Sequence, residues 1–270
     1  YALVDARDLS ADWTDLAQAM CHRRLGVGAD GILLVLPSDC ADVRMRMFNP
    51  DGSEADMCGN GIRCLAKYVL ERGIVDREKR PLMVETMVGV RPLVPTWRDG
   101  KVVRALVAMG EAGLDPGAIQ VSLPEGVAKG PVMDYPMTVD GLDLKLTFVS
   151  MGNPHAVAFV ATPVGEFPLH IIGPQIEHHS IFPNHVNFSI VNVGDRSGLS
   201  ARVWERGAGE TLACGTGACA IAVASRLHGY SGDDVDITLP GGVLGVVLDD
   251  LGGVHLEGPV EEVFEGEWGR

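Results

Sequence analysis

Two segments of the chain repeat one short pattern at a fixed distance. Residues 47–64 read MFNPDGSEADMCGNGIRC and residues 203–220 read VWERGAGETLACGTGACA, so Cys58 corresponds to Cys214 at an offset of 214 − 58 = 156 residues. In both copies an extended segment and a polar, glycine-containing loop precede Cys-Gly-x-Gly, and an apolar run typical of a helix follows. The repeat predicts a chain of two similar halves, each with a helix that begins at the cysteine.

The start of a helix changes the chemistry of a thiol. Backbone N–H groups of the first turn have no partner inside the helix, and the helix dipole adds partial positive charge there. We therefore expect a lowered thiol pKa at these two positions. The same N–H groups can hold a carboxylate. Two such units facing each other would place two thiols on opposite sides of one bound acid.

Composition and charge exclude several classes of partner. The chain has 270 residues, of which 46% are apolar and 21% charged, as in a globular protein with an ample core. The net charge of 22 − 36 = −14 disfavours nucleic acid and anionic membranes, because both require basic patches. No apolar run approaches the roughly 18 residues of a membrane span, and no leader is visible. We expect a cytoplasmic protein, with further residues upstream of Tyr1.

The six cysteines do not form the pattern of a disulfide scaffold or a zinc site. Six cysteines in 270 residues is a low density for a secreted scaffold. The spacings within the repeats, C-x5-C and C-x4-C, match neither zinc nor thioredoxin-like motifs. Cys64 and Cys219 fall inside the apolar helices and are interpreted, like Cys21 and Cys40, as small core residues.

Two further patterns are interpreted without a binding function. The glycine-rich stretch GVGADG, residues 26–31, lacks the Lys-Ser/Thr of a phosphate loop and precedes a predicted strand. His178, His179 and His185 form a His-rich patch, but no carboxylate or cysteine with metal-ligand spacing accompanies them, so we predict a loop and no metal site.

Hydrophobic periodicity predicts few helices and many short strands. Helices are expected from Asp12 through Cys21, after Cys58 as far as Gly73, and over residues 217–228, the last apolar nearly all round and therefore buried. Strands are expected over residues 32–36, 44–48, 83–90, 101–108, 142–150, 155–160, 186–193, 201–204, 235–239, 243–248 and 254–257. Because few long helices separate these strands, parallel βαβ winding is not expected.

The resulting fold prediction is an α+β protein with two pseudo-symmetric domains, each a mainly antiparallel sheet curled around a central helix. The crossing between the halves is expected at residues 109–117, MGEAGLDPG. One half then comprises residues 1–112 and is completed by the C-terminal tail 257–270. The other half comprises residues 113–256.

Four motifs together resemble the diaminopimelate epimerase family over essentially the whole chain. They are FNPDGSEADMCGNGIRC, SMGNPH at residues 150–155, VNF around Asn187, and ERGAGETLACGTGACA. The resemblance implies two α/β domains with the active site in the cleft between them, usually in a homodimer. It implies a cofactor-independent isomerase that converts LL-2,6-diaminopimelate to the meso form in lysine and peptidoglycan-precursor biosynthesis.

The resemblance also implies a role for each residue at a matching position. Cys58 and Cys214 correspond to the two acid/base thiols, and His155 and Glu205 to groups that influence the thiol pKa values. The groups that hold the reacting α-carboxylate correspond to Gly59, Asn60, Gly215 and Thr216, and those that bind the distal amino and carboxylate groups to Asn49, Asn153, Asn187, Glu205 and Arg206. No metal and no cofactor are expected.

These residue types suit the chemistry that the resemblance implies. Inverting an α-carbon requires removal of a proton from one face and return of another to the opposite face, so a thiolate and a thiol exchange roles with direction. At the distal end of a diacid-diamine, the fork of Arg206 suits the carboxylate and Glu205 suits the ammonium. The sequence departs from the family at Gly31, where some members have Gln, and the family's first substrate-contacting Asn would precede Tyr1.

Two alternatives remain open at this point. One is a related two-cysteine racemase or epimerase of another amino acid, such as proline or hydroxyproline. The other is a binding or redox-sensing protein in which Cys58 and Cys214 form a reversible disulfide. The first differs in substrate, and the second would show no exchange of a substrate proton with solvent.

Overall fold

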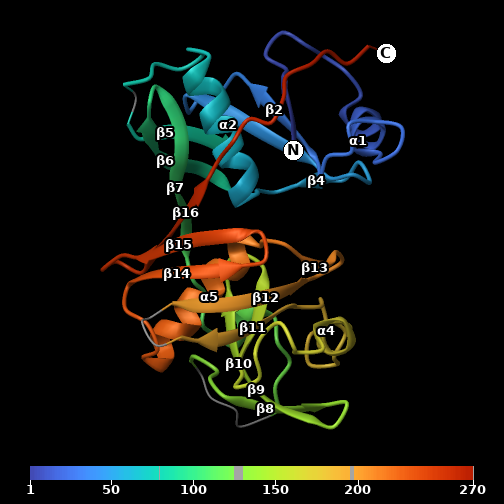
Figure 1. The fold of residues 1–270 in the computed structure, drawn as a ribbon, viewed down its shortest axis with the longest axis vertical. Coiled ribbons are helices and arrows are strands. Elements are labelled where there is room, and N and C mark those ends of the chain that lie inside the picture. Colours follow the sequence, from blue (N-terminus) through green and yellow to red (C-terminus); the bar gives the residue numbers. More distant parts are fainter. Residues whose placement is uncertain (79, 125–129, 195–197, 270) are drawn as a thin grey trace. The chain divides into compact units, whose positions relative to one another are not determined.

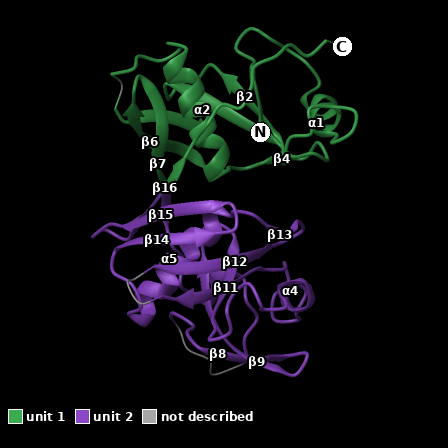
Figure 2. Ribbon diagram, in the orientation of Figure 1, with its two compact units in different colours: residues 1–108, 257–270 green, residues 109–256 purple. Residues whose placement is uncertain are grey.

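The computed structural model describes residues 1–78, 80–124, 130–194 and 198–269 (Figure 1). The chain divides into two compact units (Figure 2), of which unit 1 contains residues 1–108 and 257–270 and unit 2 contains residues 109–256. The chain passes between the units within strands β7 (Lys101–Glu111) and β16 (Gly253–Pro259). The C-terminal tail therefore belongs to the same unit as the N-terminus.

Unit 1 is a sheet in the order β1-β2-β3-β5-β6-β7 with helix α2 packed against it. Helix α2 (Gly59–Glu71) contacts β2, β3 and β6, and its stripe Ile62, Leu65, Ala66, Val69 and Leu70 is fully buried. This confirms the predicted amphipathic helix. The other elements of the unit are β1 (Ala2–Asp5), α1 (Trp13–Cys21), β2 (Ile32–Leu36), β3 (Val43–Phe48), β4 (Glu54–Ala55), β5 (Leu82–Thr86) and β6 (Gly89–Arg98).

Unit 2 is a sheet in the order β15-β14-β12-β11-β10-β9-β8 that surrounds helix α5 (Gly215–His228). Because α5 contacts β9, β10, β11, β14 and β15, strands from distant places in the sheet order meet one helix, and the sheet must curl around it. The buried run from Gly217 to Ser225 confirms the predicted all-round burial. The remaining elements are α3 (Pro116–Ile119), β8 (Tyr135–Val139), β9 (Leu142–Ser150), β10 (Pro154–Phe159), α4 (Leu169–Glu177), β11 (Asn187–Val193), β12 (Leu199–Glu205), β13 (Gly209–Thr211), β14 (Asp234–Leu239) and β15 (Gly242–Leu248).

The predicted fold class is confirmed, with one correction to the strand directions. Most neighbouring strands are antiparallel, but β1 and β2, β3 and β5, β10 and β11, and β12 and β14 pair in parallel. Each parallel pair is joined by one helix of the chain, as a parallel connection requires. The expectation of no βαβ winding was therefore wrong at these four places, because short helices of 9 residues suffice for α1 and α4.

Two other local expectations were wrong. Residues 83–90 do not form one strand, because β5 ends at Thr86 and a turn leads to Gly89, whose φ of +101° a side chain would oppose. Helix α4 was not predicted, since Gly173 and Pro174 lie inside it and both are unfavourable in an isolated helix. Tertiary packing overrides this local preference: Leu169, Ile172 and Ile176 of α4 belong to the buried core of unit 2.

Candidate functional site

Cys58 is the N-cap residue of α2. Its backbone is extended, with φ −137°, and its Sγ accepts a hydrogen bond from the N–H of Gly61 at 3.4 Å. The phenolic oxygen of Tyr1 lies 3.1 Å from the same sulfur. Loss of hydration at the phenol and the neighbouring Cys58 raise the pKa of Tyr1. The phenol therefore keeps its proton at neutral pH and can donate it to a thiolate in a hydrogen bond.

Cys214 occupies the equivalent place on α5. Its Sγ accepts from the N–H of Gly217 at 3.3 Å and lies 3.6 Å from the hydroxyl of Thr216. Burial, and next the charge of Glu205, raise the pKa of Cys214, whereas Thr216 and Gly217 oppose the rise. The expected lowering of the thiol pKa was wrong here, since loss of hydration outweighs the helix N–H groups. Cys214 is a protonated thiol in the free protein at neutral pH.

Each copy of the repeat contains one arginine–glutamate ion pair. Arg46 of β3 makes a bidentate ion pair with Glu54, at 2.6 and 2.9 Å, and Arg202 of β12 does the same with Glu210, at 2.7 and 2.9 Å. The arginines share the offset of the cysteines, 202 − 46 = 156 residues. Their role is to hold the β3–β4 and β12–β13 hairpins that lead into the cysteine helices.

His155 and Asn153 lie next to Thr216 in unit 2. The Nε2 of His155 is 3.0 Å from Asn153 Oδ1, and Asn153 Nδ2 donates to the Thr216 hydroxyl at 3.3 Å. Burial, and next the charge of Arg206, lower the pKa of His155 to about 3, so its imidazole is neutral. Its Nδ1 has no hydrogen-bond partner among the described residues. The chain His155–Asn153–Thr216 ends at the hydroxyl beside Cys214.

The Glu205–Arg206 turn is tied to Asn187. Asn187 Oδ1 accepts the backbone N–H of Arg206 at 2.9 Å, and Asn187 Nδ2 donates to the carbonyl of Pro154, also at 2.9 Å. Glu205 accepts from the hydroxyl of Thr211. Arg206 donates to the carbonyl of Asn184 at 3.0 Å. It also lines an open pocket of about 480 Å³, whose other lining residues are Gln120, Pro183, Asn184 and His185.

In unit 1 the predicted amides make local bonds. Asn49 Nδ2 donates to the hydroxyl of Ser53 at 3.0 Å, within the loop between β3 and β4. Asn60 Oδ1 accepts from Arg63 at 2.9 Å, and the same guanidinium donates to the carbonyl of Gly59 at 2.8 Å. Arg63 is buried, with its pKa lowered chiefly by burial. It thus orients the first turn of α2, where the carboxylate-holding N–H groups are expected.

The predicted site residues fall into two local groups. Around the start of α2 lie Asn49, Cys58, Gly59 and Asn60, and around the start of α5 lie Asn153, His155, Asn187, Glu205, Arg206, Cys214, Gly215 and Thr216. The sequence reasoning missed Tyr1, Glu177 and Thr211. Tyr1 carried no signal, because its contact with Cys58 spans 57 positions of the chain.

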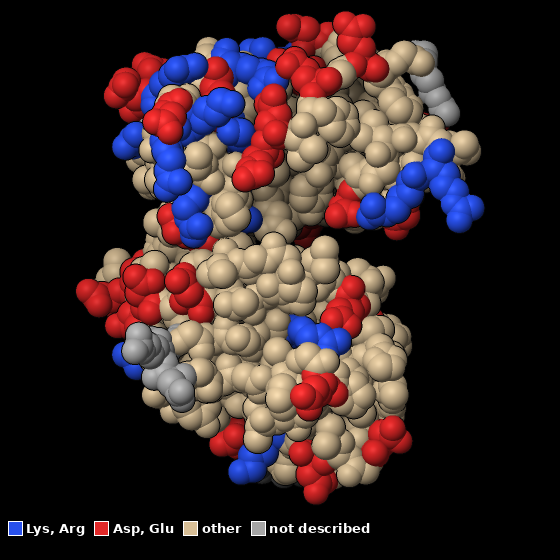
Figure 3. Space-filling view, viewed as in Figure 1, with Lys and Arg blue, Asp and Glu red and all other residues tan. Residues whose placement is uncertain are grey.

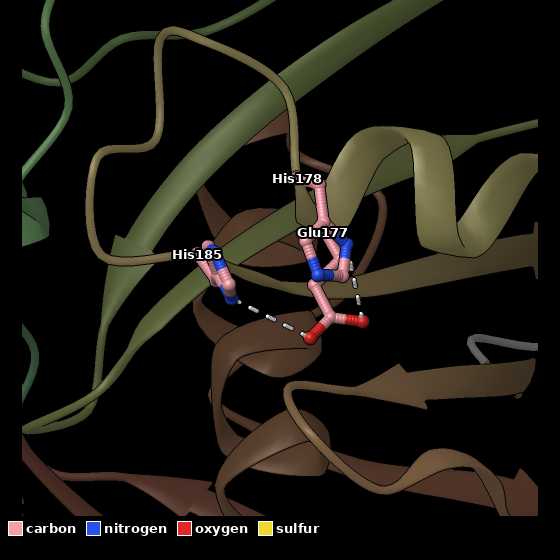
Figure 4. Close-up of side chains that lie close together, drawn as sticks. All are labelled: Glu177, His178 and His185. Atoms are coloured by element: carbon pink, nitrogen blue, oxygen red, sulfur yellow. Dashed lines mark ion pairs between the residues drawn. The ribbon is translucent and has the colours of Figure 1, made fainter.

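The His-rich patch has a carboxylate that the sequence reasoning overlooked. Glu177, the last residue of α4, lies between His178 and His185 (Figure 4). Its Oε2 is 3.9 Å from the Nδ1 of His178, and its Oε1 is 3.9 Å from the Nδ1 of His185. One potential ligand atom from each residue falls within 4.8 Å of the others. The statement that no carboxylate accompanies the patch was therefore wrong, while His179 stands outside this group.

Charged side chains are distributed unevenly over the visible surface. Figure 3 shows Lys and Arg side chains gathered mainly on unit 1, interleaved with Asp and Glu, whereas much of the visible face of unit 2 is uncharged. The ion pairs of unit 1 include Arg72–Glu262 and Arg104–Glu257, each at 2.9 Å. No helix in the described part of the chain is long and apolar enough to cross a membrane.

Solved structures with a similar fold define the class. A probable proline racemase from Agrobacterium radiobacter is 18% identical, with a TM-score of 0.65 over 91% of this chain and 78% of that chain. A phenazine biosynthesis protein of the PhzF family from Bacillus anthracis is 20% identical, with a TM-score of 0.63 over 96% of this chain and 90% of that one. The fold is therefore the one that racemases and PhzF-type proteins share.

Sequence comparison identifies the family within that class. The family model described as diaminopimelate epimerase matches residues 1–114 and 147–263. The diaminopimelate epimerase of Acetivibrio thermocellus is 48% identical over 255 residues, covering 94% of this chain and 89% of the relative. That of Moorella thermoacetica is 45% identical over 271 residues, covering 99% and 95%. The chain belongs to the diaminopimelate epimerase family, as the motifs indicated.

Proposed function

We propose that this chain is a cofactor-independent isomerase that interconverts LL- and meso-2,6-diaminopimelate by proton transfer between two thiols. Family membership supports the substrate. The observation that carries the mechanism is the repeated position of Cys58 and Cys214, each the N-cap of a helix that follows a strand hairpin, and each with a first-turn N–H donated to its sulfur. Such a reaction supplies precursors for lysine and peptidoglycan.

The surroundings of the two thiols support different resting roles. Cys214 is protonated in the free protein, so it enters the first reaction as the acid. We assign the base to Cys58, whose sulfur lies within hydrogen-bond distance of the Gly61 N–H and the Tyr1 phenol. Cys58 takes the α-proton from one face while Cys214 gives its proton to the other. The thiols then hold exchanged protonation states, which is the form required for the reverse direction.

The remaining residues of both groups are assigned by what they can donate or accept. The N–H groups of Gly59, Asn60, Gly215 and Thr216 lie in the first turns of α2 and α5, where they suit the reacting α-carboxylate and would stabilise the charge that develops on it. Arg206, beside the open pocket, suits the distal carboxylate. Glu205 suits the distal ammonium. Asn187 is assigned to holding the Arg206 backbone, with Asn49 and Asn153 as further distal contacts.

The proposal is tested by turnover in deuterated water. LL-diaminopimelate is expected to yield the meso isomer with one deuterium at the inverted α-carbon, because the returning proton comes from a solvent-exchanged thiol. Mass spectrometry of the product measures this incorporation. Proline and hydroxyproline are the comparison substrates, since they lack the second charged end. Absence of turnover with diaminopimelate, or inversion without deuterium, would contradict the proposed reaction.

Tyr1→Phe is expected to lower the activity without unfolding the protein, because the Cys58 thiolate loses a hydrogen-bond donor. The variant removes one hydrogen bond to the Cys58 thiolate, and a bond of this kind contributes about 1.5 kcal/mol, or roughly tenfold in an equilibrium. Because the donor stabilises the thiolate, its loss is expected to lower kcat/KM at neutral pH by up to about tenfold. An unchanged kcat/KM would show that the phenol has no influence on Cys58. Tyr230→Phe, on the other unit, is the matched control.

We also propose that the active form is a homodimer in the cytoplasm, on the strength of the family resemblance. Sedimentation equilibrium of the purified protein measures the mass in solution. A value near twice the 28.7 kDa of one chain is expected, and a monomer at working concentrations would contradict it.

A further inference from the structure

Glu177 is a buried carboxylate whose two oxygens accept one hydrogen bond from the end of β12 and one from the turn that follows it. Its side chain is 5% exposed. One oxygen, Oε2, accepts from the indole Nε1 of Trp204 at 2.7 Å, and the other, Oε1, accepts from the backbone N–H of Gly207 at 2.8 Å. Each oxygen of the carboxylate thus accepts a bond from one short stretch of chain, and both bonds are strengthened by the negative charge.

These two bonds bracket the residues assigned to the distal end of the substrate. Trp204 immediately precedes Glu205, and Gly207 immediately follows Arg206. The turn itself requires Gly207, whose φ is +76°, and the Arg206 N–H between the two anchors donates to Asn187. The position of the Arg206 backbone is thus fixed by one bond from β11 and two from the end of α4.

The packing beneath the turn is equally close. Gly173 of α4 lies against the indole of Trp204, and a Cβ at residue 173 would come within 2.6 Å of two ring atoms. The helix therefore approaches the ring at its backbone, which places Glu177, one turn further along α4, within reach of the indole nitrogen. The glycine that weakens α4 locally has its reason in this contact.

The same carboxylate belongs to the possible metal group of Figure 4, with His178 and His185. Its hydrogen bonds favour a role in anchoring the Glu205–Arg206 turn over a role in binding a metal ion. Both oxygens already accept short bonds, while each imidazole stands 3.9 Å away from them. The Nδ1 of His178 is also only 3.0 Å from the carbonyl of Pro174, within its own helix. The hydrogen bonds that Glu177 does accept come from Trp204 and Gly207, on either side of the Glu205–Arg206 turn.

We propose that Glu177 is a positioning residue that fixes the Glu205–Arg206 turn through Trp204 and Gly207 and thereby sets selectivity for the doubly charged far end of the substrate. This inference rests on the proposed function. It adds a residue that touches no substrate and acts through the turn alone. Loss of the anchor is expected to weaken recognition of the distal carboxylate and ammonium more than it slows the thiol chemistry.

Glu177→Gln tests the proposal, because the amide has the same shape but can accept only one of the two N–H bonds. KM for LL-diaminopimelate is expected to rise about tenfold with kcat changed less than about threefold, as for loss of binding shared by ground and transition states. The preference for diaminopimelate over 2-aminopimelate, which lacks the far ammonium, should fall. In the double variant Glu177→Gln/Trp204→Phe, the indole N–H that would face the amide nitrogen is absent. KM for LL-diaminopimelate is therefore expected to be no higher in the double variant than in Glu177→Gln.

Glu71→Gln is the matched control. Glu71 in unit 1 also accepts from a side chain and a backbone N–H, those of Lys67 and Val102, both at 2.7 Å. If Glu177 were merely structural, both variants would lower thermal stability and leave KM unchanged, which overturns the proposal. Arg206→Gln separates the two claims: an unchanged KM there contradicts the distal assignment itself, whereas a raised KM there with an unchanged KM in Glu177→Gln contradicts only the positioning role.

Zn²⁺ alone is the probe for the competing use of the cluster. In calorimetry, Zn²⁺ binding is expected to be the same for the wild-type protein and for His178→Ala/His185→Ala. Treatment with a chelator should leave KM unchanged. Tight binding lost in that double variant, together with a KM that rises on chelation, would identify a metal site and overturn the proposal.

Discussion

Alanine at Cys58 or at Cys214 is expected to lower kcat for epimerisation by about 10³-fold or more, within the range of a general acid or base. The double variant is expected to show no measurable inversion. Each thiol has a role that the other cannot take over in the same half-reaction, because the proton leaves one face of the α-carbon and arrives at the other. Turnover of LL-diaminopimelate followed by chiral chromatography measures the loss.

Cys64→Ala is the control for these variants. Cys64 lies on α2, two turns or fewer from Cys58, and is a half-buried free thiol whose pKa burial raises. No role in the proton transfers is assigned to Cys64, so near wild-type kcat is expected. Full activity in the Cys58→Ala/Cys214→Ala variant would exclude the two-thiol mechanism outright.

Phe148→Ala is expected to lower the free energy of unfolding by about 3–5 kcal/mol, the usual result for a large buried ring. Phe148 of β9 is fully buried, and its ring centroid lies 5.5 Å from that of Tyr135 and 5.4 Å from that of Phe182. Removal of the ring leaves a cavity that β8 and the segment after α4 cannot both close. Denaturant unfolding followed by circular dichroism measures the change.

Leu251→Ala is the matched control for stability. Leu251 is 90% exposed, so its replacement is expected to change the unfolding free energy by less than about 0.5 kcal/mol. A loss below about 1 kcal/mol in Phe148→Ala would mean that the aromatic contacts around β9 contribute little to the core of unit 2.

Features that depend on neighbouring residues could be predicted from the sequence. The helix after Cys58 was recognisable because apolar residues recur every three or four positions, and the buried helix after Cys214 because it is apolar on all sides. The Asp12 cap of α1 was predicted for the same reason, and its side chain accepts the Asp15 N–H as a cap should. Caps, glycine turns and helix stripes involve only a few consecutive residues.

Features that depend on distant partners could not be predicted. Helix α4 contains Gly173 and Pro174, and only packing against the core and Trp204 explains why it forms. The turn between β5 and β6 interrupts an apolar run that alone reads as one strand. The bond between Tyr1 and Cys58 joins the two ends of a 57-residue separation, and no local pattern marks it.

That two cysteines begin two helices could be predicted from local patterns, because capping and periodicity involve only neighbouring residues, and the motifs indicated the family. The environment of each thiol depends on the folded structure. Cys214 is buried beside Glu205, and the loss of hydration there reverses the lowering of its pKa that the helix start predicted. Cys58 instead meets the phenol of Tyr1. Hydration and long-range contacts depend on which distant segments fold against each other, and the pattern that the two motifs share does not reveal that difference.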